Sequence, residues 1–177
     1  MLLFKRPIAG LRKLTATAGI GAALCLGLPI SDAHALDGCI VLPGTYLLTV
    51  DNSDGTFASR QFLTLTVEGN AIVDDSAEGG VTGVFNPFTT GKGVWECTSS
   101  FPKITADVTT LDFSLPGSVA GPQSIGRDDY ELTLSVPSNT VSGAIQLRFF
   151  PLSGNPLVTP LPPPASTYTF TGVRVTN

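Results

Sequence analysis

The sequence predicts an all-β fold, an eight-stranded antiparallel up-and-down barrel preceded by a signal peptide, with a β-sandwich as the alternative. Beyond residue 36, apolar and polar residues alternate with a period of two, which is typical of strands that bury one face. No window in this part of the sequence combines a helical period with capping residues. Short turns link neighbouring runs, and sequential hairpins favour a barrel because closure removes the edges of the sheet.

The first 35 residues have the three parts of a signal peptide. The basic part contains Lys5, Arg6, Arg12 and Lys13. Residues 14–30 are mostly apolar, but they are interrupted by Pro29 and are too short for the about 20 residues of a spanning helix. Ala33 and Ala35 match the small-residue cleavage pattern. We therefore expect cleavage after Ala35, a single barrel domain over residues 36–177, and no stable membrane span in the mature chain.

Removing the first 35 residues changes the composition of the chain. The remaining 142 residues hold six basic and 13 acidic side chains, a net charge of 6 − 13 = −7, with two Cys and no His. This excludes imidazole chemistry, a histidine metal site, a polycationic nucleic-acid surface and a scaffold with several disulfides. We expect no cofactor, no metal and no nucleic-acid partner.

The two remaining cysteines, Cys39 and Cys97, predict one disulfide in an oxidising compartment. Closing a loop of about 58 residues would stabilise the fold by roughly 4 kcal/mol in the chain-entropy model. A reactive thiolate is the alternative, but no His is present to activate it. Residues 36–39 also resemble a lipobox; we favour the disulfide because Asp37 fits that motif poorly and a lipidated Cys39 would leave Cys97 without a partner. The expected location is secreted or periplasmic.

Alternating runs predict the individual strands. We expect strands over residues 45–51, 61–68, 71–75, 91–98, 104–113, 130–136, 141–150 and 167–176. Turns are expected at 52–55 and 68–70, where Gly55 and Gly69 supply the conformational freedom that tight turns need. Loops are expected at 78–87, at 116–128 and at 156–164, since five prolines bar the last from a central strand.

Acidic residues cluster at three places, each at the edge of an expected loop. The segment 51–55 lacks the spacing of a calcium loop, because Gly55 stands one position too early. The other two clusters are Asp74-Asp75 and Asp128-Asp129-Glu131. Short acidic runs are little evidence for calcium binding, so we expect no metal site.

Four short segments resemble small secreted bacterial β-barrels of the calycin-like (lipocalin-like) kind. They are Gly44-Thr45-Tyr46, Phe62-Leu63-Thr64-Leu65-Thr66, Gly93-Val94-Trp95-Glu96 and Gly172-Val173-Arg174. There is a looser likeness to allene-oxide-cyclase-type barrels. The resemblance implies an interior pocket for a small apolar molecule.

The candidate ligand-binding residues are Trp95, Tyr46, Phe149, Arg148 and Arg174. Trp95 is either a pocket wall or a core anchor, and an arginine such as Arg174 or Arg148 over its ring would form a cation–π contact. Arg148 would orient a ligand carboxylate if its face of the strand pointed inward, and lies on the surface if it pointed outward. Strict alternation favours the outward orientation.

Glu96 is the candidate catalytic group, as an acid desolvated by its apolar neighbours. The alternative is that Glu96 faces solvent while Trp95 and Cys97 face the core, which strict alternation favours.

Three functions fit these residues. The first is a barrel that binds a small hydrophobic ligand in its interior. The second is a cofactor-free isomerase or cyclase that uses an apolar cavity and a carboxylate. The third is a structural or interaction module with a filled core. The absence of His in the mature chain makes us prefer binding to catalysis, although the sequence does not exclude an enzyme.

Mass spectrometry of the exported protein tests the processing. We expect a mature chain that begins at Leu36 and is two hydrogens lighter than the reduced form, because cleavage follows Ala35 and the two cysteines are joined. A lipid adduct on Cys39 would contradict both expectations.

Overall fold

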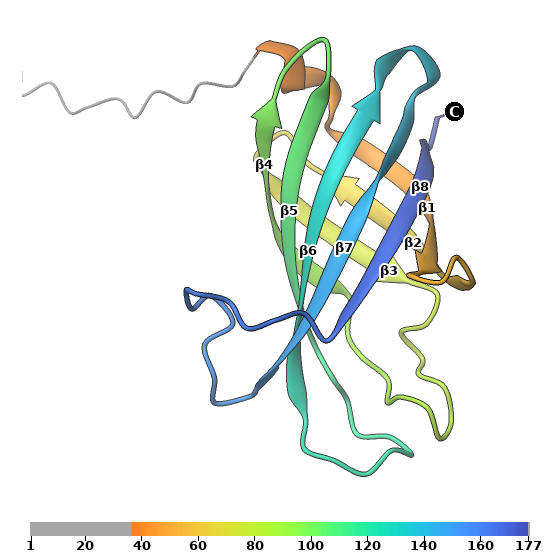
Figure 1. Ribbon diagram of the computed structural model, residues 1–177, viewed down its shortest axis with the longest axis vertical. Coiled ribbons are helices and arrows are strands. Elements are labelled where there is room, and N and C mark those ends of the chain that lie inside the picture. The colour runs from red at the N-terminus through yellow and green to blue at the C-terminus, as the bar shows by residue number, and fades with distance from the viewer. Residues whose placement is uncertain (1–36, 177) are drawn as a thin grey trace, which may run out of the picture. The chain divides into compact units, whose positions relative to one another are not determined.

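Eight antiparallel strands close into one up-and-down barrel, as the sequence predicted (Figure 1). The computed structural model describes residues 37–176, so the expected signal peptide and its cleavage site at Ala33 and Ala35 lie outside the described residues. The strands are β1 (Gly44–Asn52), β2 (Phe57–Leu65), β3 (Asn70–Asp75), β4 (Gly91–Ser99), β5 (Ile104–Phe113), β6 (Ser124–Ser135), β7 (Thr140–Pro151) and β8 (Ser166–Arg174). Two short 3-10 helices, η1 (Asp37–Val41) and η2 (Val136–Ser138), complete the described elements.

Each strand pairs with its neighbour in the sequence, and β1 pairs with β8 to close the sheet. The closing register runs from Tyr46 opposite Arg174 to Asn52 opposite Tyr168. Closure gives every strand one inner and one outer face, with side chains alternating between them. The architecture is consistent with the calycin-like fold.

The boundaries of β2 and β6 differ from the sequence prediction. β2 begins at Phe57 rather than at residue 61 and ends before the Thr66–Asn70 turn, in which the Thr66 N–H donates to the Asn70 carbonyl (2.9 Å). β6 begins at Ser124, so most of its first six residues fall in the segment expected to be a loop. Those residues pair with β5 on one side and β7 on the other. Pairing with both neighbours therefore overrides their polar composition.

The two ends of the barrel differ in their connections. At the loop end, three long loops join the strands: residues 76–90, 114–123 and 152–165. At the turn end lie η1 and the short connections 66–69, 100–103 and 136–139. Large side chains fill the interior toward the turn end and are almost completely buried, among them Leu42, Tyr46, Leu48, Leu63, Leu65, Ile104, Leu132 and Val141.

The predicted disulfide is present and joins η1 to β4. The Cα atoms of Cys39 and Cys97 are 6.2 Å apart, within the usual range for a disulfide. Arg174 fastens the same region, since its guanidinium donates to the carbonyl oxygens of Val41 (2.8 Å) and Pro43. The chain entering β1 is thus held against the turn end from two sides.

Gly93→Ala is expected to lower the free energy of unfolding by about 1–3 kcal/mol. A Cβ at this position of β4 would lie 1.8 Å from the carbonyl oxygen of Thr109 on β5, so backbone would have to move. Urea unfolding measures the change. Gly79→Ala is the matched control, because a Cβ there meets nothing within 4 Å. Equal losses in the two variants would contradict the expectation.

Candidate functional site

Three of the expected ligand-binding residues lie toward the turn end, where they complete the core. Tyr46 is fully buried, and its hydroxyl donates to the Leu42 carbonyl (2.7 Å). The guanidinium of Arg174 lies 5.6 Å from the centre of the Tyr46 ring, so the cation–π contact forms on Tyr46 rather than on Trp95. Trp95 packs against the core, and its indole N–H donates to the Thr66 carbonyl (2.8 Å).

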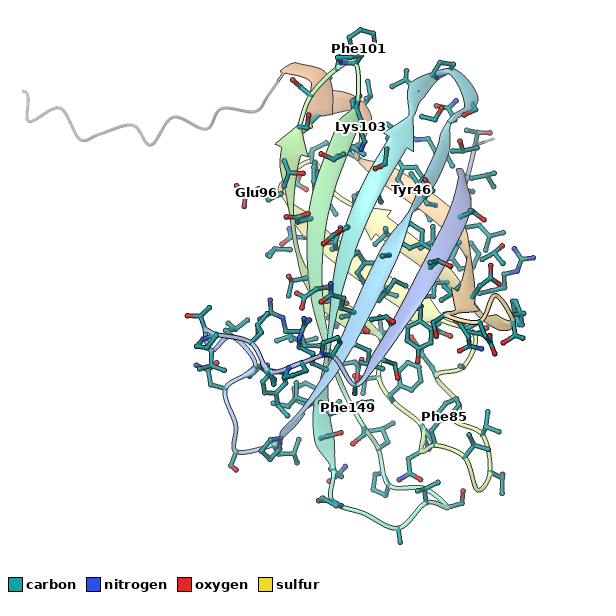
Figure 2. The ribbon with its side chains drawn as sticks, viewed as in Figure 1. Tyr46, Phe85, Glu96, Phe101, Lys103 and Phe149 are labelled. Atoms are coloured by element: carbon teal, nitrogen blue, oxygen red, sulfur yellow. A yellow bond between two sulfur atoms is a disulfide. The ribbon has the colours of Figure 1, made fainter. Side chains whose placement is uncertain are left out.

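Glu96 and Arg148 lie on the outer face. Glu96 is exposed between inward-facing Trp95 and Cys97, and its side chain extends away from the barrel (Figure 2). It therefore does not reach a substrate inside the barrel. Arg148 lies on the outward face of β7 but is covered by the proline-rich loop, to which its Nε donates at Pro162 (2.8 Å).

Phe149 is the expected ligand residue that lies at the loop end on the inward row of β7, next to the outward-facing Arg148 (Figure 2). It pairs across the sheet with Gly126, yet 56% of its surface stays exposed. The carboxylate of Asp112 lies over Gly126, since a Cβ on that glycine would be 2.6 Å from the Asp112 Oδ1. Phe149 thus stands beside an acidic group that the sequence analysis did not single out.

A chain of polar side chains crosses the interior near the loop end. The Tyr130 hydroxyl donates to Gln61 Oε1 (3.2 Å), and Gln61 Nε2 donates to Asp75 Oδ2 (2.7 Å). The Asp75 carboxylate also accepts hydrogen bonds from Ser59 Oγ (2.9 Å) and the Ala77 N–H (2.7 Å). Asp75 is therefore held in a fixed orientation by three donors.

Two further carboxylates face the interior beside this chain. Asp112 ends the inward row of β5, and Asp128 follows Gly126 in the inward row of β6. Because Asp112 is paired with Gly126 and Thr110 with Asp128, the two carboxylates are diagonal neighbours across the sheet. As whole residues both are half-buried, and the Asp128 carboxyl group is almost completely enclosed by the protein.

The enclosed position of Asp112 and Asp128 raises the pKa of both carboxyl groups. Burial first, and then the nearby carboxylates of Asp112, Asp75 and Asp129, together raise the pKa of Asp128 to about 8. Burial also raises the pKa of Asp112 to about 6, although the Gly126 backbone N–H opposes the rise. Near neutral pH, Asp128 therefore carries a proton.

Thr110 adds an unused polar group. Its side chain is completely buried, and its Oγ1 has no hydrogen-bond partner in the structure. The hydroxyl faces the interior, because a Cβ on Gly91 of the next strand would lie 3.2 Å from it. It lies beside the Tyr130 phenol, where its interaction with the phenol opposes the burial that raises the pKa of Tyr130. Buried polar atoms are normally paired, so an unpaired one beside two carboxylates marks this place as unusual.

Asp129, which follows Asp128 in the sequence, lies on the outer face of β6 and is paired with basic side chains. Its carboxylate forms ion pairs with Arg127 (2.8 Å) and Arg148 (2.6 Å). Arg127 Nη1 also donates to the Pro156 carbonyl (2.8 Å), so both arginines hold the 152–165 loop against the barrel. Within the described residues, these arginine pairs belong to Asp129 and not to Asp112 or Asp128.

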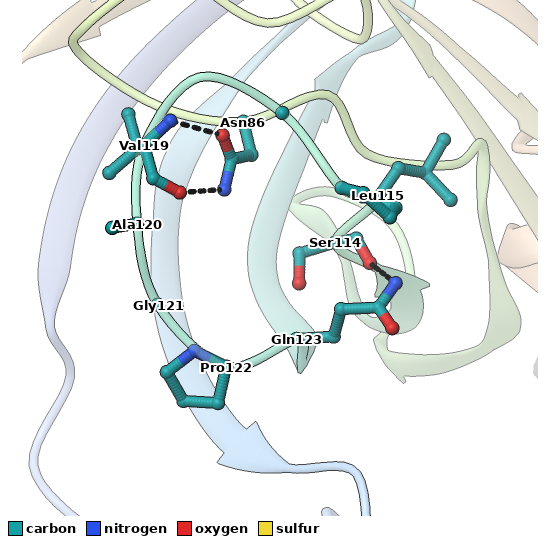
Figure 3. Close-up of a pocket in the computed structure, with 10 residues that line it drawn as sticks. Asn86, Ser114, Leu115, Val119, Ala120, Gly121, Pro122 and Gln123 are labelled. Carbon is teal, nitrogen blue, oxygen red and sulfur yellow. Dashed lines mark hydrogen bonds between the residues drawn. The ribbon is translucent and has the colours of Figure 1, made fainter.

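The other two long loops are tied to each other. The Asn86 side chain accepts from the Val119 N–H (2.8 Å) and donates to the Val119 carbonyl (2.8 Å), and the Leu115 N–H donates to the Pro87 carbonyl (2.6 Å) (Figure 3). Between Asn86 and residues 114–123 lies an open hollow of about 460 Å³. A second hollow, of about 430 Å³, lies over β5, β6 and β7 and includes the outward-facing Asp107 and Glu131.

Comparisons with protein-family models, with curated proteins and with solved structures gave no significant match. Function is therefore inferred from the geometry of the loop end alone. That geometry offers carboxyl groups of different protonation, a free hydroxyl and a nearby aromatic ring. In the part of the chain that the structure describes, no group of His, Cys, Asp and Glu side chains is arranged to hold a metal ion.

The sequence contained a signal for the inward orientation of Asp128 and Asp112, which was not predicted. Extending the alternation of Tyr130, Leu132 and Leu134 backward places Asp128 and Gly126 on the same inward face. Residues 116–128 were expected to form a loop, so the inward orientation of Gly126 and Asp128 was not predicted. Asp112 likewise continues the inward row of Ala106, Val108 and Thr110.

Asp128→Asn tests the protonation of the interior. The folded protein holds a proton on Asp128 up to about pH 8, whereas the unfolded chain loses it near pH 4. Stability from this group is therefore complete at low pH and is lost as the pH rises toward 8. We expect the melting temperature of the variant, relative to wild type, to increase by about 5 °C or more between pH 4.5 and pH 8.

The matched control is Asp107→Asn, which alters an exposed carboxylate on the outer face of β5. Its melting temperature should differ from wild type by the same small amount at every pH. If the Asp128→Asn curve also ran parallel to wild type, the interior carboxyl would not be protonated as described.

Proposed function

We propose that this chain is a secreted or periplasmic barrel that binds a small apolar ligand at its loop end. The observation that carries the proposal is that half of the exposed large apolar side chains among the described residues lie on the segments of that end. They are Phe57, Val81, Val84, Phe85, Phe113, Leu115, Phe149, Leu152, Leu157 and Val158. Exposed apolar groups concentrated around the opening of a fold are typical of an interaction site.

The distribution of burial supports binding at this end rather than deep in the barrel. Tyr46, Leu48 and Leu63 have no exposed surface and occupy the interior toward the turn end. Asp75, Asp112 and Asp128 face the interior at the loop end and keep part of their surface exposed. A ligand would therefore enter from the loops and stop above the packed core.

The ordering of the loops supports a preformed site. Asn86 joins two of the loops through its side chain, and Asp129 holds the third through two arginines. A rim that is already ordered loses little conformational entropy when a ligand binds. This favours ligand binding over a purely structural role for the loops.

Two features support the proposed compartment. The disulfide between Cys39 and Cys97 is typical of proteins outside the cytoplasm. None of the helices in residues 37–176 is long and apolar enough to cross a membrane. Both fit the expected export by a signal peptide cleaved after Ala35.

Proton transfer is the second candidate function. Asp75 accepts three hydrogen bonds and is held in place, while the raised pKa of Asp128 keeps a proton nearby. A protonated carboxyl group with a raised pKa beside other carboxyl groups is an arrangement that general acid–base catalysis uses. The role once considered for Glu96 would then fall to these interior groups.

Phe149→Ser tests the proposed binding end. We expect it to weaken binding of the neutral apolar dye Nile red by at least about tenfold, because burying a phenyl ring against an apolar ligand contributes about 1.5–3 kcal/mol. Fluorescence titration measures the affinity. The control is Phe101→Ser, which removes a 74% exposed phenyl ring at the turn end (Figure 2). Absence of dye binding by the wild type, or equal losses in the two variants, would contradict the proposal.

A further inference from the structure

We propose that the apolar ligand is uncharged and carries a carboxamide group, which the hollow between Asn86 and the 114–123 loop receives. The inference rests on the proposed function and names the place of the site within the loop end and the chemical class of the ligand, a neutral alkyl amide. The hollow has a volume of about 460 Å³. Pockets that bind small molecules have volumes of about 300–1,000 Å³, so this hollow is large enough for a ligand.

Hydrogen bonds hold the two ends of the 114–123 loop together. Gln123 Nε2 donates to the Ser114 carbonyl (3.1 Å), and the Ser124 N–H donates to Ser114 Oγ (2.7 Å). The Ser114 N–H donates in turn to the Ser124 carbonyl (2.9 Å). A surface loop of this length whose ends are joined is an Ω-loop, which is normally packed by its own side chains and is frequently functional.

The centre of this loop is open instead of packed. Asn86 braces its far side, because the amide of Asn86 pairs with both main-chain groups of Val119 (Figure 3). A Cβ on Gly117 would come 2.4 Å from Asn86 Oδ1, so the glycine permits this close approach. Ala120 and Gly121 line the hollow and have little or no side chain with which to fill it. The loop is therefore held open around a space that a ligand can occupy.

The lining of the hollow excludes a charged ligand. Among the described residues, the ten that line the hollow are all uncharged, although residues 36–177 have a net charge of 6 − 13 = −7. A charged head group would lose part of its hydration there without meeting an opposite charge, which lowers its affinity. A neutral head group avoids this cost.

The main chain of the loop supplies polar partners. The N–H groups of Gly117, Ala120 and Gly121 donate to no other group within residues 37–176. A ligand that displaces water from such groups must replace the hydrogen bonds that the water made. A carboxamide has a carbonyl acceptor and N–H donors without a charge. It therefore replaces those hydrogen bonds, whereas a hydrocarbon does not.

Apolar side chains provide contacts for the rest of the ligand. Leu115, Pro116 and Val119 line the hollow. Phe113 lies two residues before Leu115 and is also exposed, so the apolar rim continues from the hollow. An alkyl chain would lie along these side chains while the amide contacts the main chain.

The test compares octanamide, octylamine and octanoate, which have similar alkyl chains and different charges. Titration of the isotope-labelled, oxidised exported protein at pH 7, followed by NMR, gives both the affinity and the location of each compound. We expect octanamide to bind at least about tenfold more tightly than either ion. It should shift the amide resonances of residues 114–123 and of the Asn86 side chain. Non-specific attraction by the acidic chain would instead favour octylamine.

Asn86→Asp and Asn155→Asp form a matched pair of variants. Each adds one negative charge at the loop end and keeps the side-chain oxygen that accepts from Val119 (2.8 Å) or Leu157 (2.9 Å), respectively. Only Asn86 lines the hollow. Asn86→Asp should therefore abolish the preference for octanamide over octylamine, whereas Asn155→Asp should retain it.

Leu115→Ser keeps the proposal testable if Asn86→Asp fails to fold. It removes an apolar part of the lining, so octanamide should bind at least about threefold more weakly. The control is Ile40→Ser, which removes an 81% exposed aliphatic side chain of the same size at the turn end. Octanamide binding to this control should equal binding to the wild type.

The possible results separate the two proposals. Equal affinities, or tightest binding of octylamine, overturn the neutral amide, and resonance shifts at the loop end would then leave the proposed function standing. A preference for octanamide with resonance shifts elsewhere, or one that survives Asn86→Asp, overturns the assignment to this hollow. Binding of none of the three compounds overturns both proposals.

Discussion

The pairing of β1 with β8 is the constraint on which the rest of the structure depends. Once the sheet is closed from Tyr46–Arg174 to Asn52–Tyr168, each strand has an enclosed face and an outer face. A side chain on the enclosed face must be buried, paired or placed near an opening. Because the alternation is strict, the adjacent residues Asp128 and Asp129 lie on opposite sides of the sheet. One holds two arginines outside, and the other faces the interior without a cation.

The enclosed side chains differ in kind between the two ends of the barrel. Toward the turn end, aliphatic and aromatic side chains fill the interior, and the disulfide and Arg174 hold η1 against it. Toward the loop end, the inward rows of β3, β5 and β6 finish in Asp75, Asp112 and Asp128. Burying carboxyl groups without a counter-charge costs stability, which protonation of Asp128 reduces. Departures from good packing rules concentrate at functional sites, and this one coincides with the exposed apolar rim.

Much of the fold was predictable because it depends on local patterns. The period of two located the strands, and an even cysteine count after the expected cleavage predicted the pairing of Cys39 with Cys97. The start of β6 was misplaced because its polar residues are retained in the strand by pairing with both neighbours. The start of β2 was misplaced because residues 57–60 are retained by pairing with β1. The candidate site was harder to predict. Phe149 was named as a ligand residue and lies at the loop end, whereas Tyr46, Trp95 and Arg174 belong to the opposite end of the barrel.

By itself, the sequence determined that residues 36–177 alternate as strands, have no imidazole and carry a surplus of acids. These properties follow from composition and from neighbours along the chain. Only the tertiary structure decided which acids share a space. Asp75, Asp112 and Asp128 come from three strands, and their proximity depends on register and on the absence of a side chain at Gly126, over which the Asp112 carboxylate lies. Whether a carboxyl group is charged depends on burial and on charges distant in sequence, so the acidity of the loop end became defined only when the barrel closed.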